Sequence, residues 1–479
     1  MSDDHTGTEI LNLGQDFPPV PTATWEAAIQ KDLKGADYEK RLVWRSDEGI
    51  SIRPYYRSES LAGLGAQTSS IPGQFPFVRG DGKAWKIDQQ AVLSADAIRA
   101  DLVLEAGADA IQQLGIALAA GVERLSLLCE DHPVDIAASE IEFIFAVGST
   151  YFFEIAKLRA ARLLWAQAVT AFAPADLDCC RMKLHVRTSR LNKSTCEPYT
   201  NVLRVTTEAM SAAMGGCETL TIEPFGFEEH LALGVQRVLA EEAHLNAVAD
   251  PAGGSYYIEA LTASLAREAW KLFRRIEASG GYSQVLSAGW LAEEIAKTRA
   301  ALEKAVSSRR RTLVGVNNYP DLNGKALESV PGPASGPSPF PQFRLAEPFE
   351  KIRERTERHV RKTGHVPKVL LLKRGDVKMR TARANFALNF FGCAGFAIAG
   401  SEDYAETNAD LIVLCSSDPE YLPFAQEVCS VAHVPVIVAG NPKEQADALK
   451  AAGVQGFINI ASDAVETLTD WQNRLGVTS

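Results

Sequence analysis

The chain has 479 residues, of which 46% are apolar and 23% are charged, and this composition is typical of a soluble globular protein with room for two or three domains. Its formal net charge of −11 argues against nucleic acid or an anionic membrane surface as the main partner. Eight cysteines occur without any Cys-x-x-Cys spacing, and no apolar run is long enough to span a bilayer. We therefore expect a cytoplasmic protein with free thiols.

Residues 1–74 are interpreted as an N-terminal arm. A short helical pattern from Trp25 to Leu33 ends at Gly35, and Ile50–Tyr56 alternates as a short strand does. We expect this arm to pack over a neighbouring domain or subunit.

Residues 75–320 alternate between strand and helix patterns, which favours parallel β/α architecture. The predicted strands are Phe75–Arg79, Ile141–Val147, Met182–Thr188, Thr219–Glu223 and Thr312–Val316. The clearest predicted helices are Phe152–Phe172, Tyr199–Met214, Leu261–Ile276 and Trp290–Val306. A closed barrel of β/α units needs about eight strands. Because one helix-like stretch, Ala95–Ala120, fills most of the space between Trp85 and Ile141, we predict an incomplete barrel of the TIM type.

A proline-rich boundary separates this region from the last domain. Ser329–Gln342 contains five prolines, two glycines and three serines, which is typical of an extended linker. With a charged bridging helix at Pro348–Lys362, the linker region covers residues 321–366.

Residues 367–479 are predicted to form a doubly wound, flavodoxin-like domain. The predicted strands are Val369–Leu372, Phe396–Ile398, Leu411–Leu414, Val434–Val438 and Gly456–Ile460, and the predicted helices are Val377–Phe391, Pro419–Val431, Lys443–Ala452 and Asp463–Arg474. Ligands of such sheets bind beyond the carboxyl ends of the strands.

The strand Met182–Thr188 carries the most informative side chains. Lys183, His185 and Arg187 fall on one face of it, and His185 and Arg187 lie toward the carboxyl end, where β/α barrels place their chemistry. Three groups that are cationic or can become so do not line a dry core. Either this face is open because the barrel is incomplete, or it meets an anion.

Two segments here resemble the methylmalonyl-CoA mutase family. The run HVRTSR, residues 185–190, stands where catalytic chains of the family carry His-x-Gln-Thr-Ser-Gly, and residues 190–225 look like the following unit of the small, non-cobalamin subunit. The resemblance implies that His185 matches the histidine that contacts substrate, whereas Arg187 replaces the glutamine and Arg190 the glycine. The anion would then be a substrate carboxylate or a coenzyme A phosphate.

The resemblance also accounts for the short barrel and for a later loop. AGADAIQQLGIALAAG, residues 106–121, looks like two family segments joined by an internal deletion that removes barrel strands. Asp250-Pro-Ala-Gly-Gly-Ser-Tyr-Tyr resembles a family motif that precedes a helix, and we interpret it as a turn with a helix N-cap.

The last domain resembles the cobalamin-binding domain of the family but departs from its metal motif. Where that motif reads Asp-x-His-x-x-Gly, this chain has Asp376, Val377, Lys378, Met379, Arg380 and Thr381. The ammonium group of Lys378 has no lone pair for cobalt near neutral pH, and Asp376 is expected to cap the following helix. We therefore expect no metal site and no cofactor on this chain.

The resemblance implies a small, non-catalytic subunit of a heterodimeric methylmalonyl-CoA mutase. The homologous large subunit would carry adenosylcobalamin and convert methylmalonyl-CoA to succinyl-CoA. One alternative is an acyl-CoA mutase that works with a separate cobalamin-binding chain, in which Lys183, His185 and Arg187 contact the acyl-CoA. A second alternative is a sensory module whose last domain binds another ligand.

Overall fold

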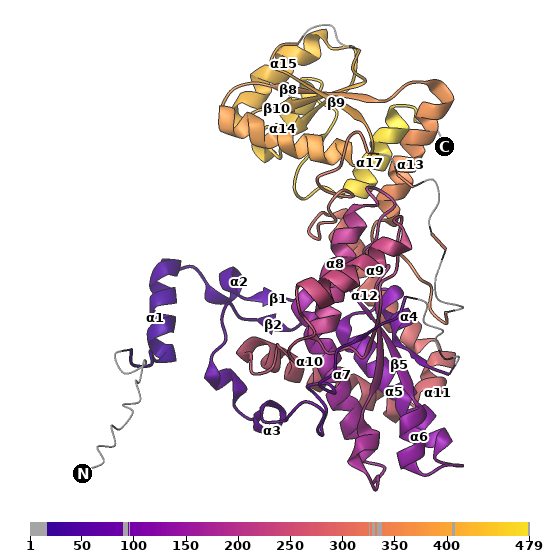
Figure 1. Ribbon diagram of the computed structural model, residues 1–479. Coiled ribbons are helices and arrows are strands. Elements are labelled where there is room, and N and C mark those ends of the chain that lie inside the picture. The colour runs from indigo at the N-terminus through magenta and orange to yellow at the C-terminus, as the bar shows by residue number, and fades with distance from the viewer. Residues whose placement is uncertain are drawn as a thin grey trace, which may run out of the picture. The chain divides into compact units, whose positions relative to one another are not determined.

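The computed structural model describes residues 17–89, 94, 96–324, 326–327, 331–332, 338–404 and 408–477. Its internal contacts divide the chain into two units, and the boundary in the sequence falls between Arg57 and Ser58. The chain is of the mixed α/β class, and the larger unit contains two parallel sheets of five strands each (Figure 1).

The first unit is small and has little core of its own. It consists of α1 (Thr22–Leu33), α2 (Tyr38–Leu42), β1 (Trp44–Arg45) and the antiparallel β2 (Ser51–Ile52). Neither of these two described helices contains a fully buried side chain. The Trp25 ring lies 5.2 Å from the ring of Tyr55, and the guanidinium of Arg57 lies 4.8 Å from it. The predicted strand stops early because Pro54 cannot donate to a ladder.

The first five-stranded sheet has the order β3-β7-β6-β5-β4. Its strands are β3 (Lys86–Ile87), β4 (Ile98–Arg99), β5 (Glu142–Val147), β6 (Lys183–Thr188) and β7 (Thr219–Thr221), and all pairings are parallel. Strands β4 to β7 are therefore neighbours in chain order, and β3, which precedes them in the chain, pairs with β7. Within the described residues β3 and β4 form the two edges of this sheet.

The strand predictions for this region were partly wrong. Strands β5, β6 and β7 confirm three of the five, whereas 75–79 and 312–316 are not strands. The backbone turns at Phe77, whose φ is 57° and whose N–H donates to the Gln74 carbonyl at 2.7 Å. Near residue 314 there is an isolated bridge between Val314 and Asn318. The pattern missed β3 and β4, which have two residues each.

Helices surround this sheet (Figure 1). The short helical elements are η1 (Ser58–Leu61), α3 (Gly65–Thr68), α4 (Ala100–Glu105), α6 (Val134–Glu140), η2 (Leu177–Cys180), α9 (Glu229–Arg237), the π-helical η3 (Val238–Glu242) and α11 (Tyr282–Ser287). The long helices are α5 (Ala110–Leu128), α7 (Tyr151–Thr170), α8 (Thr200–Met214), α10 (Tyr256–Ala278) and α12 (Trp290–Ser307), and the last four confirm predictions.

The single helix predicted over Ala95–Ala120 is wrong, because this stretch contains β4, α4 and the start of α5. The chain breaks at Gly107, where φ is 96° and where a Cβ atom would lie 2.5 Å from the ring of Phe343. Only glycine combines this backbone conformation with this close approach. Asp109 then starts α5 by accepting the N–H of Gln112 at 2.8 Å.

Strand β5 lies in the apolar core of the first sheet. The Phe143 ring packs edge to face against Trp165 of α7, with 4.8 Å between ring centroids, and both side chains are fully buried. Helix α5 approaches the pair at Gly121, where a Cβ atom would lie 2.6 Å from Phe143. Burying each of these aromatic side chains stabilises the fold by about 2–3 kcal/mol.

The second sheet has the order β12-β11-β10-β8-β9. Its parallel strands are β8 (Lys368–Lys373), β9 (Ala397–Ser401), β10 (Leu411–Cys415), β11 (Val436–Ala439) and β12 (Phe457–Ile458), and all five confirm predictions. Alternate residues of β8 face opposite layers. Leu371 packs with Phe390 of α14 (Val377–Gly392), and Leu370 packs with Phe424 of α15 (Tyr421–Val431).

The helices of this last region also follow the sequence prediction. They are α13 (Glu347–Thr363), α14 (Val377–Gly392), η4 (Asp418–Glu420), α15 (Tyr421–Val431), η5 (Lys443–Gln445), α16 (Ala446–Ala451) and α17 (Ala464–Arg474). Of the predicted linker Ser329–Gln342, residues 329–330 and 333–337 lie outside the described residues, and the rest contains no helix or strand. Across the described ranges, no helix combines the length and apolar character needed to cross a bilayer.

Candidate functional site

The three side chains that the sequence places on one face of β6 differ in their exposure to solvent. His185 and Arg187 are 3% and 5% exposed, respectively, whereas Lys183 at the start of the strand is exposed. Because β6 lies between β5 and β7, its carboxyl half is covered by neighbours on both edges. The candidate site is therefore a buried pair rather than an open trio.

The positive charge of Arg187 is met by two carboxylates of the same chain. Its Nη1 lies 3.0 Å from Oδ2 of Asp101, and its Nη2 forms an ion pair with Glu223. Asp101 also accepts two hydrogen bonds from the guanidinium of Arg99, at 2.8 and 2.7 Å. Burial opposes the charge of Arg187, but Glu223 and Asp101 outweigh burial and raise its pKa. The sequence left open whether this face of β6 is exposed or meets an anion. The structure shows the second arrangement, and the anions are the carboxylates of Asp101 and Glu223.

His185 is held in one tautomer by a short chain of hydrogen bonds. The hydroxyl of Thr221 donates its single hydrogen to the Asp88 carbonyl, and its oxygen lies 3.1 Å from Nε2 of His185. The Nε2 atom must therefore be the donor of this contact. Burial, with the nearby charge of Arg187, lowers the pKa of His185 to about 4, so the imidazole is neutral near pH 7.

This depressed pKa predicts a pH dependence of stability. The unfolded histidine titrates near its ordinary pKa of about 6.5 and the folded one near 4, so the unfolded state binds more protons between these values. We expect the free energy of unfolding to fall by at most about 3 kcal/mol from this group as the pH is lowered from 7 to 4. Urea unfolding across this range should show a smaller acid loss for His185→Gln than for the wild type. Equal losses in the two proteins would contradict the assignment.

Four acidic and basic residues of this cluster were missed by the sequence analysis: Arg99, Asp101, Glu105 and Glu223. Glu105 is buried and accepts the N–H of Arg190 at 2.7 Å, and burial raises its pKa to about 7. Asp101 and Glu223 each stand two residues beyond a strand end, and acidic residues at that spacing were a usable signal. For Asp101 the signal required recognition of the two-residue strand β4.

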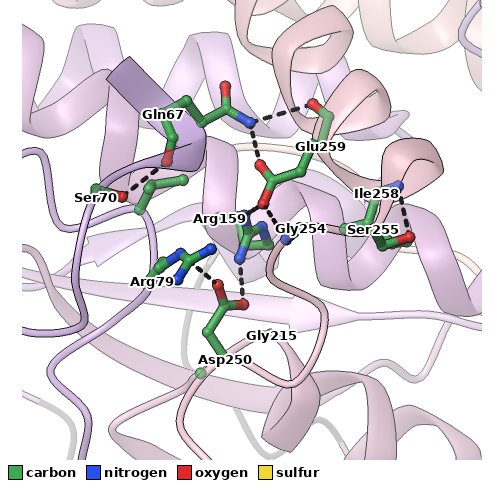
Figure 2. Close-up of polar contacts among 12 residues, drawn as sticks. Gln67, Ser70, Arg79, Arg159, Gly215, Asp250, Gly254, Ser255, Ile258 and Glu259 are labelled. Atoms are coloured by element: carbon green, nitrogen blue, oxygen red, sulfur yellow. Dashed lines mark hydrogen bonds and ion pairs between the residues drawn. The ribbon is translucent and has the colours of Figure 1, made fainter. Parts of the chain in front are cut away.

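The Asp250–Tyr257 motif forms the predicted turn and N-cap. The Ser255 side chain accepts the N–H of Ile258 at 3.4 Å and starts α10, which confirms that interpretation (Figure 2). Asp250 forms an ion pair with Arg159 of α7, and the other Asp250 oxygen lies 3.4 Å from Nε of Arg79. The turn is therefore tied to a buried cation.

Arg159 joins this turn to helix α10. Its Nη2 lies 2.7 Å from Oε1 of Glu259, and both side chains are fully buried (Figure 2). The second Glu259 oxygen accepts the side-chain N–H of Gln67 at 2.5 Å, and the backbone N–H of Gly254 donates to the first at 2.9 Å. Since every carboxylate oxygen of Glu259 has a partner, the arrangement is a structural clamp between α7, α10 and the turn.

Residues 376–381, which the sequence analysis compared with a metal motif, lie at the start of α14. The Asp376 side chain accepts the N–H of Met379 at 2.8 Å, which confirms its prediction as an N-cap. Lys378 and Thr381 are exposed on the first turns of the helix. Among the residues that the structure describes, no group of three or more His, Cys, Asp or Glu side chains is arranged to hold a metal ion.

A carboxylate of this chain lies between the carboxyl ends of β8 and β10. The Oε2 atom of Glu420 accepts hydrogen bonds from the hydroxyls of Ser416 and Ser417, at 2.8 and 2.5 Å. These bonds lower the pKa of Glu420 to about 2. The Cα atom of Gly375 approaches so closely that a Cβ there would lie 2.1 Å from Glu420. The segments that follow β8 and β10 are therefore connected through the side chain of Glu420.

Comparison with known proteins gives a consistent set of relatives. The profile of the family described as methylmalonyl-CoA mutase matches residues 84–333. The methylmalonyl-CoA mutase small subunit of Porphyromonas gingivalis is 29% identical over 620 residues, covering 98% of this chain and 99% of the relative. The small subunit of Streptomyces virginiae is 36% identical over 396 residues, covering 78% of this chain and 63% of the relative.

A methylmalonyl-CoA mutase of Cereibacter sphaeroides is 38% identical over 224 residues, which is 45% of this chain and 32% of that protein. The match to the family profile begins just before β3 and extends beyond the first sheet, so it includes strand β6, which carries the buried His185 and Arg187. By the extent of that match and by the small-subunit relatives that align with most of its length, this chain belongs to the methylmalonyl-CoA mutase family.

Proposed function

We propose that this chain is a small, non-catalytic subunit of a methylmalonyl-CoA mutase. A homologous large subunit carries adenosylcobalamin in this proposal and converts methylmalonyl-CoA to succinyl-CoA. The observation that carries the proposal is the ion-paired state of Arg187, whose guanidinium contacts Asp101 and Glu223. A substrate anion would have to displace a buried carboxylate, which costs several kcal/mol.

The other groups of the cluster support the same conclusion. His185 uses its Nε2–H on Thr221, so this donor is not free for a substrate carbonyl. Lys183 is accessible but lies at the amino end of β6, away from the carboxyl end where β/α enzymes place their chemistry. This face of β6 thus retains the histidine of the family at position 185, while the charge of Arg187 is neutralised by carboxylates of the same chain.

The last domain does not fit the cobalamin cofactor. The lower-ligand position holds the exposed Lys378, whose ammonium lacks a lone pair, and Asp376 is occupied in capping α14. Glu420 places a carboxylate between β8 and β10, beside Gly375. We propose that the cofactor is held by the partner chain alone.

The two sheets are interpreted as the two domains that the family resemblance implies. We propose that the first sheet is an incomplete β/α barrel in residues 75–320, in which β4 to β7 keep their sequential order and β3 keeps its place beside β7. The alignment with the P. gingivalis small subunit is 620 positions long, whereas this chain has 479 residues, which supports an internal deletion. In chain order the second sheet reads 2-1-3-4-5, and this order supports a flavodoxin-like domain in residues 367–479. Residues 1–74 and 321–366 remain the proposed arm and linker.

A double variant tests the view that more than the metal ligand is missing. Lys378→His with Thr381→Gly should restore the motif but not cobalamin binding, because Glu420 also places a carboxylate between the carboxyl ends of β8 and β10. Equilibrium titration followed by the absorbance of cobalamin measures the result. Micromolar affinity in the double variant would show that the histidine alone was missing.

Co-purification separates the proposal from its main alternative. We expect a tagged large subunit to retain this chain at a one-to-one ratio, and we expect calorimetric titration of the isolated chain with methylmalonyl-CoA to show no binding. Tight acyl-CoA binding by the isolated chain would favour a mutase that works with a separate cobalamin-binding chain. Binding of neither partner nor acyl-CoA would favour a sensory module.

A further inference from the structure

A cavity of about 350 Å³ lies beside the edge strand β4, and Arg99 is the one member of the cluster around Arg187 that lines it. Its walls come from Ile98 of β4, from Ile116 and Ala120 of α5, and from Phe340, which follows the proline-rich linker. Eleven of the fifteen lining residues are apolar. The cavity is partly open to solvent, and its volume and apolar lining lie within the range of small-molecule sites.

The cavity has few polar side chains, and they differ in whether they have a hydrogen-bond or ion-pair partner within the chain. Arg99 is bound to Asp101, and Glu123 accepts the backbone N–H of Ser283 at 2.9 Å. Arg124, in contrast, has one distant ion pair within the described residues, 3.8 Å from the exposed Asp96.

Tyr282 adds a second available group. Its hydroxyl has no hydrogen-bond partner among the described residues, and burial raises its pKa, so it remains a donor. The cavity therefore has an apolar interior, one available cation and one available hydroxyl donor.

We propose that this cavity binds an amphipathic anion, consisting of a single apolar chain and a negatively charged headgroup. The apolar chain lies against Ile116, Ala120 and Phe340, and the headgroup is bound by Arg124 and Tyr282. The choice of an anion rests on Arg124, because Arg99 is ion-paired with Asp101 and the Glu123 carboxylate accepts hydrogen bonds from the backbone N–H and the hydroxyl of Ser283. This inference does not depend on the proposed subunit role.

Phe340 limits the length of the ligand. Its side chain is 3% exposed and also lines a second cavity of about 340 Å³, on the side of Arg299 and α12. A chain longer than the first cavity would have to displace this ring. We therefore expect a medium-length chain, and decanoate is a suitable probe.

Two probes that differ in headgroup charge test the proposal on the full-length chain. Calorimetric titration should give a Kd of about 10–100 µM for decanoate. Arg124→Gln should raise the Kd for decanoate about five- to tenfold and leave the Kd for 1-decanol unchanged, because decanol lacks the charge. Arg267→Gln, at an exposed position of α10, is the matched control and should change neither value.

A second variant locates the site. Ala120→Phe fills the cavity and should abolish binding of both probes, while its melting temperature reports whether the fold is intact. Absence of decanoate binding in the wild type would overturn the proposal, as would equal effects of Arg124→Gln on decanoate and decanol. Unchanged binding in Ala120→Phe would show that the probe binds elsewhere, which also overturns it.

Discussion

Arg159→Ala is expected to lower the free energy of unfolding by about 3–5 kcal/mol. The substitution removes a fully buried guanidinium and leaves the buried carboxylates of Glu259 and Asp250 without their common cation. Uncompensated buried charge, rather than the loss of one contact, dominates this cost. Urea denaturation followed by circular dichroism measures it.

Arg267→Ala is the matched control for this experiment. Arg267 belongs to an exposed pair with Glu268 on α10, and pairs of that kind contribute little. We expect the control to change the free energy of unfolding by less than about 0.5 kcal/mol. A loss below about 1 kcal/mol for Arg159→Ala would contradict the description of Asp250, Arg159 and Glu259 as a structural clamp.

Arg187→Gln is the second substitution with a large expected effect. It restores the glutamine that the family resemblance places at this position, but it leaves Glu223 buried without a cation while Asp101 keeps Arg99. We expect a loss of about 2–4 kcal/mol in the free energy of unfolding at pH 8.

A double variant distinguishes an ion-pair role from a ligand-binding role. Glu223→Gln in the Arg187→Gln background removes the uncompensated carboxylate and should recover most of the lost stability, to within about 1 kcal/mol of the wild type. Denaturation of both single variants and the double variant gives the coupling energy. A near-zero coupling would mean that Arg187 is not held by Glu223 and is free to meet a substrate anion.

The second sheet could be predicted from the sequence because its strands carry strong local signals. Runs such as Leu411–Leu414 are continuously apolar, as expected for strands buried on both faces, and helices with clear caps lie between them. Asp376 illustrates the caps, since an aspartate before a helical pattern is a local signal that the structure bears out. No long-range information was needed for these elements.

The first sheet could be predicted only in part, because its edge strands are too short to show a period. Strands β3 and β4 have two residues each, and their pairing depends on the neighbours β7 and β5. The false strand at 75–79 has the right residue types, but a positive φ at Phe77 turns the backbone. Gly107 likewise divides a stretch whose apolar spacing alone resembles one helix, because Phe343 packs against it from a distant part of the chain.

The candidate site was predicted in its residues but not in its chemistry. The alternation of β6 placed His185 and Arg187 on one face, and their charge left either an open face or a nearby anion as the explanation. The partner Asp101 lies 86 residues away along the chain and Glu223 lies 36 residues away, so neither pairing could be read from local spacing. The internal neutralisation of the site is therefore a property of the tertiary structure.

The central claim is that this chain does not catalyse the mutase reaction by itself. The most direct test is the formation of succinyl-CoA from methylmalonyl-CoA in the presence of adenosylcobalamin, measured for this chain alone and for its complex with a large subunit. The account predicts turnover by the complex and none by this chain. Turnover by this chain alone would contradict it, and would require that Arg187 release its carboxylates and that a cobalt ligand other than Lys378 be used.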